Sequence, residues 1–298
     1  MRTFFRLYMR ALTLIGAIYP MQHAMPALVE APPVPSPTER NFFEADQAAS
    51  TYGEIYRGAG ICMVVLGALI VLCAVAPLAL ESDHASVRWW GLGEVALMVT
   101  VIAILVWLKH RNIRGLWVSA RLQAEQGRYR ELASKIDALE SSLAAQQDGN
   151  QPAQSLAQEL QSTLASQIAY NQSKHSHYEQ IESGASLVGA VIFGLAFLAA
   201  VTHLLVHWPW LLFFTAVGPM LAGALHGING FLRLCDLSDG HRETAQRLSQ
   251  LQDQFNRLAG LDIAPGRLLN LGRDVYAVLV TRDVKWQHMA QSLNPKLG

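Results

Sequence analysis

The longest uncharged stretch of the chain covers residues 183–232, which contain no Asp, Glu, Lys or Arg. As one helix it would be about 75 Å long, whereas the hydrocarbon core of a bilayer is only about 30 Å thick. The segment is therefore expected to cross a membrane, turn and cross back. Pro209, within His207-Trp208-Pro209-Trp210, marks the expected turn because proline interrupts a helix.

An earlier part of the chain repeats this pattern. Residues 58–80 are uncharged, residues 81–88 form a short polar loop, and residues 89–108 carry a single charge, Glu94. Two apolar hairpins of this kind predict a four-span membrane protein.

The polar segments carry apolar residues at helical spacing, and no strand pattern competes with them. Between the hairpins, Leu132, Ile136, Leu139 and Leu143 step by four, three and four, as in a heptad seam. Similar stripes are formed by Leu156, Leu160, Leu164 and Ile168, by Leu248, Leu251, Phe255 and Leu258, and by Leu268, Leu271, Val275, Val278 and Leu279. We expect an all-α protein whose four polar helices bundle beneath the membrane, the first two continuing spans 2 and 3 into the cytoplasm.

These patterns divide the chain into five segments. Residues 1–40 form a basic and apolar N-terminal helix with a Pro-rich linker, and residues 41–108 form an entry helix and the first transmembrane hairpin. Residues 109–182 form a cytoplasmic helical hairpin, residues 183–232 the second transmembrane hairpin, and residues 233–298 the C-terminal cytoplasmic helices.

The charge distribution predicts the orientation. Of 23 Lys and Arg residues, the hairpin tips hold only Arg88, whereas residues 109–182 hold eight and residues 233–298 hold nine. This asymmetry places both termini and the middle segment in the cytoplasm. The formal net charge is zero, so no basic excess points to nucleic acid. Three cysteines, two of them inside span 1, do not form a disulfide framework.

Two interpretations fit the N-terminus. Arg2, Arg6 and Arg10 precede a brief apolar run, as in a signal peptide. The run is short, no clear small-residue cleavage site follows, and cleavage would leave the new N-terminus outside. A basic helix lying on the inner membrane surface is the preferred interpretation.

Glu94 is the only formal charge well inside a predicted span. A carboxylate at the midplane costs about 2.5–3.5 kcal/mol or more. Glu94 lies about one turn from the outer tip, so it can be an interfacial carboxylate that reaches water. The alternative is a ring of carboxylates at the mouth of a cation-conducting oligomer.

Span 4 supplies the other candidates for a pore or gate. Gly223 and Gly227 are four residues apart, a spacing that lets helices approach closely within or between subunits. His226 and Asn229 share its inner end and either hydrogen-bond across helices or meet a permeant ion.

Motifs for enzymatic chemistry are missing from the sequence. It contains no nucleophile motif, phosphate-binding loop or paired catalytic carboxylates, and its His-x-x-x-His and His-x-His pairs have no third ligand at a diagnostic spacing. We therefore expect a non-enzymatic protein with no cofactor and no metal.

The helices that flank the spans carry short motifs. Ala-Asp-Gln-Ala-Ala at 45–49 is followed by Tyr52 and Tyr56-Arg57, and Trp-Val-Ser-Ala-Arg-Leu-Gln-Ala-Glu occupies 117–125. In the tail, Val-Lys-Trp at 284–286 follows a long helix. Over residues 42–293 the chain resembles SLATT-type membrane domains, the SMODS- and SLOG-associating transmembrane effectors.

This resemblance implies a bacterial defence effector of the inner (cytoplasmic) membrane that assembles or opens on a nucleotide signal. Such proteins carry a sensor domain, but only about 40 residues of basic helix and Pro-rich linker precede span 1 here. A separate cytoplasmic sensor protein, or a nucleotide bound by the helical bundle, is then expected to deliver the signal.

Four residues of the flanking helices are candidates for the cytoplasmic bundle. Arg121 and Glu125 are four apart on one helix face, which gives either an ordinary surface ion pair or a fixed polar clamp. Trp117 and Trp286 are aromatic residues in polar helices and are expected to anchor the bundle core rather than stack on a ligand.

Two hypotheses for function follow. The first is a homo-oligomeric pore-forming or channel-like effector in the lipid bilayer, gated from the cytoplasmic side in antiphage defence. The second is a non-conducting membrane scaffold that recruits a cytoplasmic partner through helical seams such as Leu139 and Leu143.

Overall fold

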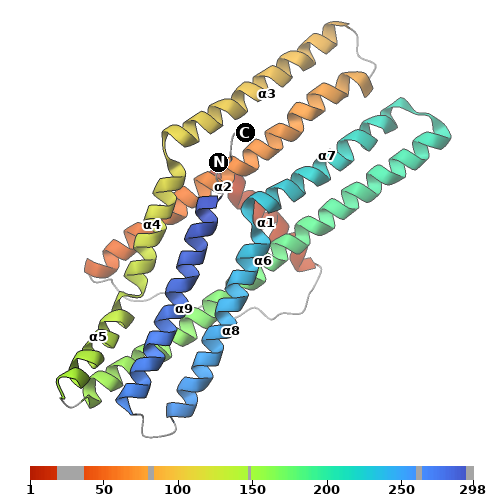
Figure 1. Cartoon of the computed structure of the whole chain (residues 1–298). Coiled ribbons are helices and arrows are strands. Elements are labelled where there is room, and N and C mark those ends of the chain that lie inside the picture. Colours follow the sequence, from red (N-terminus) through yellow and green to blue (C-terminus); the bar gives the residue numbers. More distant parts are fainter. Residues whose placement is uncertain (19–36, 80–83, 147–148, 260–263, 293–298) are drawn as a thin grey trace. The chain divides into compact units, whose positions relative to one another are not determined.

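A computed structural model describes residues 1–18, 37–79, 84–146, 149–259 and 264–292. All secondary structure in these ranges is helical, as predicted (Figure 1). The helices are α1 (Arg2–Ile18), α2 (Pro37–Ala79), α3 (His84–His110), α4 (Ile113–Arg128), α5 (Arg130–Ala144), α6 (Asn150–Val206), α7 (Pro209–Leu232), α8 (Leu234–Ala259) and α9 (Pro265–Ser292).

Four of these helices are long and apolar enough to cross a membrane. The segments are Phe42–Pro77, Ser86–His110, Asn150–Val206 and Trp210–Leu232. They fall in α2, α3, α6 and α7, where the uncharged stretches of the sequence lie. The prediction of four apolar helices able to span a bilayer is therefore confirmed.

The chain forms two compact units, and it passes from one to the other within α2, α4 and α6 and at the start of α8. The first unit consists of Met1–Met21, Ser50–Trp117 and Glu179–Leu234, and it contains α3, α7 and the apolar parts of α2 and α6. The second unit consists of Gln22–Ala49, Val118–Tyr178 and Cys235–Gly298, and it contains the polar helices.

In the first unit, α6 ends at Val206 and α7 begins at Pro209, so the helix breaks where the proline predicts. His207 adopts a left-handed conformation with φ of 55°. Further along, a methyl group at Gly218 would overlap Ala196 of α6. Small residues at this point therefore allow α6 and α7 to approach closely.

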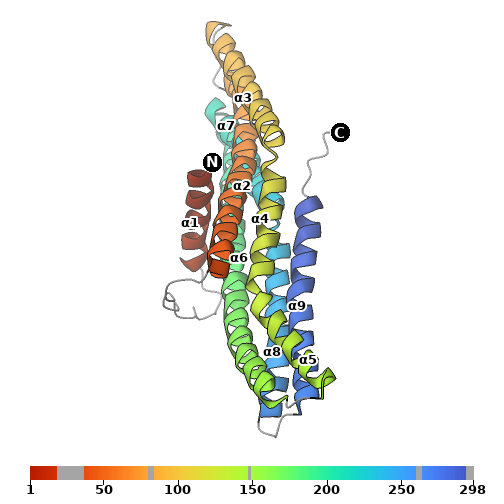
Figure 2. The ribbon, with the colours of Figure 1, turned by 90° about the vertical axis from the view of Figure 1, so that its left-hand side faces the viewer.

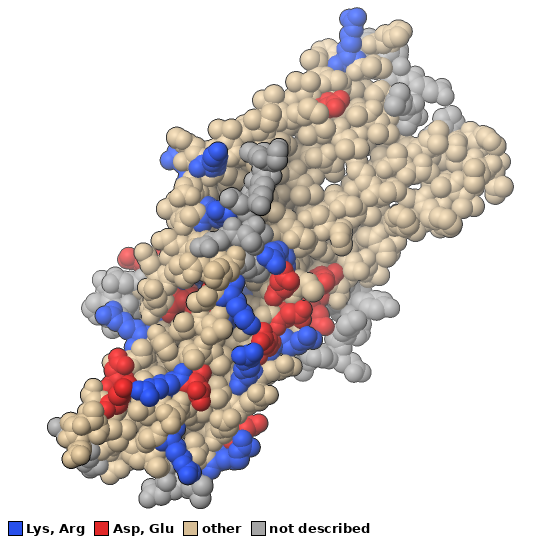
Figure 3. All heavy atoms as spheres, viewed as in Figure 1, with Lys and Arg blue, Asp and Glu red and all other residues tan. Residues whose placement is uncertain are grey.

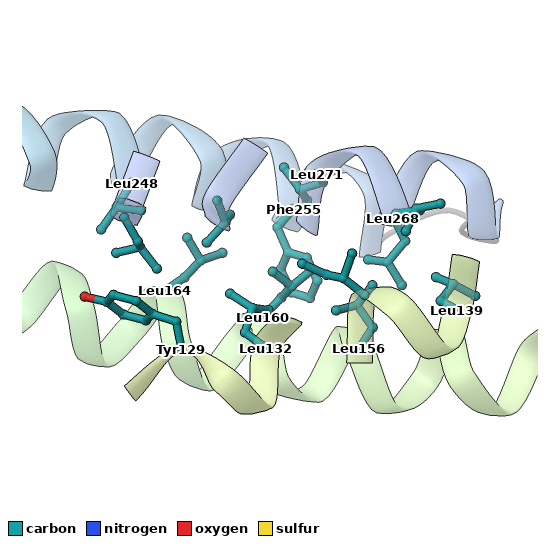
Figure 4. Packing of buried hydrophobic residues seen from close by; sticks show 14 of the residues in the cluster. Tyr129, Leu132, Leu139, Leu156, Leu160, Leu164, Leu248, Phe255, Leu268 and Leu271 are labelled. Carbon is teal, nitrogen blue, oxygen red and sulfur yellow. The ribbon is translucent and has the colours of Figure 1, made fainter. Parts of the chain in front are cut away.

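In the second unit, the four predicted stripes share one core. Leucine, isoleucine, valine and phenylalanine side chains from α5, α6, α8 and α9 pack together (Figure 4), and these helices lie side by side in both ribbon views (Figures 1 and 2). Leu139, Leu156, Leu160, Leu164 and Leu248 are fully buried. Each such leucine contributes about 1.5–3 kcal/mol by leaving water.

One prediction about the helices is wrong. Span 2 was expected to continue as a single helix, but α3 ends at His110 and a new helix starts at Ile113. Between them, Asn112 has a left-handed φ of 45°, a conformation that asparagine tolerates better than most residues. The polar loop predicted over residues 81–88 also ends early, because α3 already starts at His84, while residues 80–83 lie outside the described residues.

Span 3 does continue as predicted. The helix α6 runs over 57 residues without interruption. Its single proline, Pro152, lies in the first turn, where the missing backbone N–H has no helical partner to lose.

A buried charged cluster as the candidate functional site

The second unit contains a carboxylate that is almost completely buried and is met by three arginines. Glu125 lies on α4, and its side chain is 4% exposed. Arg121 and Arg128 pair with it from the same helix, Arg128 at 3.0 Å. Arg282 of α9 places its Nη2 3.2 Å from Glu125 Oε2. We call these four residues the Glu125 cluster.

Helical spacing explains half of this arrangement. Arg121 is four residues before Glu125 and Arg128 is three after it, so all three project from one face of α4. A buried carboxylate is costly unless it is paired and hydrogen-bonded, and hydrogen bonds between two ionised groups are the stronger kind. The ion pairs of Arg121 and Arg128 with Glu125 lie within α4. Arg282 adds an ion pair that joins α4 to α9.

Two further carboxylates balance the charge. Asp46 of α2 lies 3.4 Å from Arg128 and 4.0 Å from Arg121. Asp283 lies 2.9 Å from Arg282. Three guanidinium groups therefore face three carboxylates contributed by α2, α4 and α9. Nη1 of Arg282 is buried and has no hydrogen-bond partner among the described residues.

Aromatic residues surround the charges. Arg282 donates a hydrogen bond of 2.7 Å to the hydroxyl of Tyr129, and burial raises the pKa of this tyrosine, so that it stays protonated. The guanidinium of Arg128 lies 5.4 Å from the ring centre of Phe42 and 5.8 Å from that of Tyr170. Such cation–π contacts strengthen when water is excluded.

A second set of hydrogen-bonded polar side chains lies between α6 and α8. Nδ1 of His241 is 2.7 Å from Oδ1 of the fully buried Asn171, and the imidazole stacks on Tyr178 with ring centres 5.8 Å apart. Nδ1 of His175 is 2.8 Å from the hydroxyl of Ser238. Burial first, and then nearby positive charges such as Arg282, lower the pKa of His241 to about 3.

This shift predicts a pH dependence of stability. An unfolded histidine has a pKa of about 6.5 and binds a proton that folded His241 does not accept until about pH 3. The contribution of His241 to the free energy of unfolding should therefore be fully present above about pH 6.5. It should fall by about 2 kcal/mol between pH 7 and pH 5. Urea unfolding of the second unit at several pH values measures the loss.

The matched variants are His241→Gln and His288→Gln. Glutamine at 241 cannot take up the proton, so this variant should show a shallower pH dependence than the wild type. His288 is exposed on α9, so its replacement should keep the wild-type slope. Equal slopes for the wild type and His241→Gln would show that the histidine is not the source.

The predicted bundle residues are brought together only in part. Arg121 and Glu125 pair, and the guanidinium of Arg121 lies 6.0 Å from the ring centre of Trp286. The hypothesis of an ordinary surface ion pair is wrong, because Glu125 is buried and also pairs with Arg128 and Arg282.

Trp117 does not belong with these residues. It lies in the first unit, where its ring stacks on Tyr56 of α2 at 5.7 Å and the guanidinium of Arg57 lies 5.2 Å from its centre. The expectation that Trp117 anchors the helical bundle is therefore wrong. Its indole instead packs against Gly53, where a Cβ would lie 2.7 Å from Nε1 and leave no room for a side chain.

The predicted pore residues are spread along α3 and α7. Glu94 is partly exposed on α3 and has no hydrogen bond or ion pair with any described residue. Gly223 faces open space, and a Cβ at Gly227 would lie 3.8 Å from Val64 of α2. His226 is exposed, and Asn229 accepts a hydrogen bond of 3.1 Å from the hydroxyl of Tyr8.

The sequence interpretation missed several residues of the site. Arg128 could have been included, since it stands one turn after Glu125 on the same face. Asp46 and Arg282 are 79 residues before and 157 residues after Glu125, and no spacing rule connects them. Among the described residues, no group of His, Cys, Asp or Glu side chains is arranged to hold a metal ion.

No protein family, curated protein or solved structure matches the chain. The fold and site by themselves define its class. All secondary structure of its described residues is helical, and it combines four helices able to cross a membrane with a second unit that contains a buried carboxylate met by three arginines.

Proposed function

We propose that this chain is a four-span protein of the bacterial inner membrane that assembles into a pore or channel, with the second unit and both termini in the cytoplasm. Its spans form two transmembrane hairpins. The distribution of Lys and Arg supports this orientation, since eight lie in residues 109–182 and nine in residues 233–298. On the face shown in Figure 3, charged side chains gather over α5, α8 and α9, while α7 and the end of α6 carry almost none.

The observation that carries the pore proposal is the carboxylate of Glu94. It stands on α3, whose most apolar 18-residue stretch is only 6% buried within the chain, and no described residue pairs with it. A carboxylate within a span is stable only if it meets water or a partner. Assembly of several copies around a water-filled path supplies both, and the ring of carboxylates then selects cations.

The Glu125 cluster supports gating from the cytoplasmic side. It ties α4 to α9, and through Asp46 also to α2, by charges that a bound signal or partner can redistribute. The chain runs from the second unit to the first within α2 and α4, so a change in the cluster has a covalent route to the spans. The resemblance to SLATT-type domains supports a role in antiphage defence, with a separate sensor protein or a nucleotide as the trigger.

The test is ion flux from liposomes that contain the purified protein, with its oligomeric state recorded in parallel. Glu94→Gln should reduce the preference for K⁺ over Cl⁻ several-fold, because the negative ring is lost. Glu94→Asp keeps a carboxylate and should keep most of the preference. An assembled, conducting protein with unchanged selectivity in Glu94→Gln would remove Glu94 from the pore.

A non-conducting scaffold is the second candidate, and one feature favours it. Tyr276, Val280 and Val284 recur every four residues on α9 and are 36%, 37% and 45% exposed, which forms an apolar stripe on the second unit. The seam that contains Leu139 is predicted from the sequence to bind the partner, but it is not accessible, because Leu139 is fully buried in the core. Absence of flux from a folded protein, alone or with cytoplasmic extract, would favour the scaffold.

A further inference from the structure

The N-terminal helix α1 packs on the spans by one face. Phe5 and Leu12 are 8% and 4% exposed, whereas Phe4 and Leu7 on the opposite face are 50% and 66% exposed. A helix that merely floats on a bilayer buries nothing in its own protein. The burial of Phe5 and Leu12 therefore shows a docked helix, with an outer apolar face left for the lipid interface.

The basic residues of α1 are occupied by a carboxylate of α2. Glu54 accepts hydrogen bonds from Nε of Arg2 at 2.8 Å and from Nε and Nη2 of Arg6 at 3.0 Å and 2.9 Å. The side chain of Glu54 is 14% exposed. A fork of this kind is geometrically specific, and it engages two of the three arginines of α1 with a carboxylate of the same chain.

The backbone of α1 also approaches α2 closely. A Cβ at Gly58 would overlap the carbonyl oxygen of Met1, so glycine is what allows this contact. Next to it, the guanidinium of Arg57 lies 5.1 Å from the ring centre of Phe5. The first turn of α1 is thus fixed to α2 by an ion pair, a backbone contact and an aromatic contact.

The middle of α1 reaches α7. The hydroxyl of Tyr8 donates its hydrogen bond to Asn229 at 3.1 Å, and burial raises the pKa of Tyr8 to about 12, so the donor proton is retained. In the same region α7 meets α2 directly, because a Cβ at Gly227 would lie 3.8 Å from Cγ1 of Val64. One short helix therefore contacts both partners of an α2–α7 packing.

We propose that α1 is a clamp that fastens α2 to α7 through Glu54 and Asn229. The inference goes beyond the pore or scaffold function, since it concerns what holds the two spans together. It assigns to Arg2, Arg6 and Tyr8 a structural task in place of membrane attraction.

The test uses a disulfide between cysteines at Val64 and Gly227 as a probe of α2–α7 proximity. A Cβ built at Gly227 lies 3.8 Å from Cγ1 of Val64, an atom attached to Cβ as the sulfur of a cysteine would be, so cysteines at the two positions are neighbours. The full chain, with Cys62, Cys73 and Cys235 replaced by alanine, is reconstituted in bilayers and oxidised. The rate of cross-linking is then followed by non-reducing electrophoresis.

Removing the clamp by Arg2→Gln with Arg6→Gln, or separately by Glu54→Gln, should slow cross-linking about tenfold. Arg10→Gln is the control, because no hydrogen bond or ion pair joins Arg10 to a described residue, and it should leave the rate unchanged. Cross-linking at the control rate in both clamp variants would overturn the proposal, as would a mature protein whose N-terminus, read by mass spectrometry, lies beyond α1. The cross-linking readout does not require conduction, so a failed pore would leave it standing.

Discussion

Replacing Glu125 by glutamine is expected to lower the free energy of unfolding of the second unit by about 3–5 kcal/mol. Glutamine fills the same space but leaves Arg121, Arg128 and Arg282 facing only two carboxylates. Breaking a buried ion pair is costly because the remaining charge stays out of water without compensation. Urea titration in detergent, followed by near-ultraviolet circular dichroism, measures the loss.

The control is Glu131→Gln on α5. Glu131 is 69% exposed and pairs with Lys135 at 3.0 Å, so the same substitution there should cost less than about 1 kcal/mol. A loss at Glu125 as small as that at Glu131 would mean that water reaches the cluster in solution.

Leu160→Ala should destabilise the second unit by about 2–5 kcal/mol. The side chain of Leu160 is fully buried. It lies among side chains from α5, α8 and α9 (Figure 4). Alanine leaves a cavity that close-packed neighbours fill only in part. The same urea titration measures this loss.

Val284→Ala serves as the comparison, because Val284 is 45% exposed on α9. It should change stability by no more than about 0.5 kcal/mol. A small effect at Leu160 would contradict the packing described for the core.

Much of the fold follows from periodicity. The uncharged stretches coincide with the four apolar helices, and residues predicted for four separate stripes are buried in one core, since helical spacing puts such residues on one face. The helix ends at His110 and Arg128 were not predicted. A left-handed Asn112 and the turn at Tyr129 are single-residue events that leave no periodic trace.

The candidate site is predictable only within one helix. The spacing of Arg121 and Glu125 shows that they can pair, but their burial depends on Asp46 and Arg282, which only the fold brings near. The error over Trp117 has the same origin. Its helix α4 crosses from one unit to the other between residues 117 and 118, a boundary set by tertiary contacts.

The contacts of α1 impose an order on biosynthesis. Its partners Glu54 and Asn229 follow their α1 contacts by about 50 and by 221 residues. At roughly 5–20 residues per second, the ribosome needs about 10–40 seconds to deliver Asn229 after Tyr8 has been made. During that interval α1 can contact α2 alone. Its contact with α7 can form only after α7 has been made, so completed docking of α1 requires both α2 and α7.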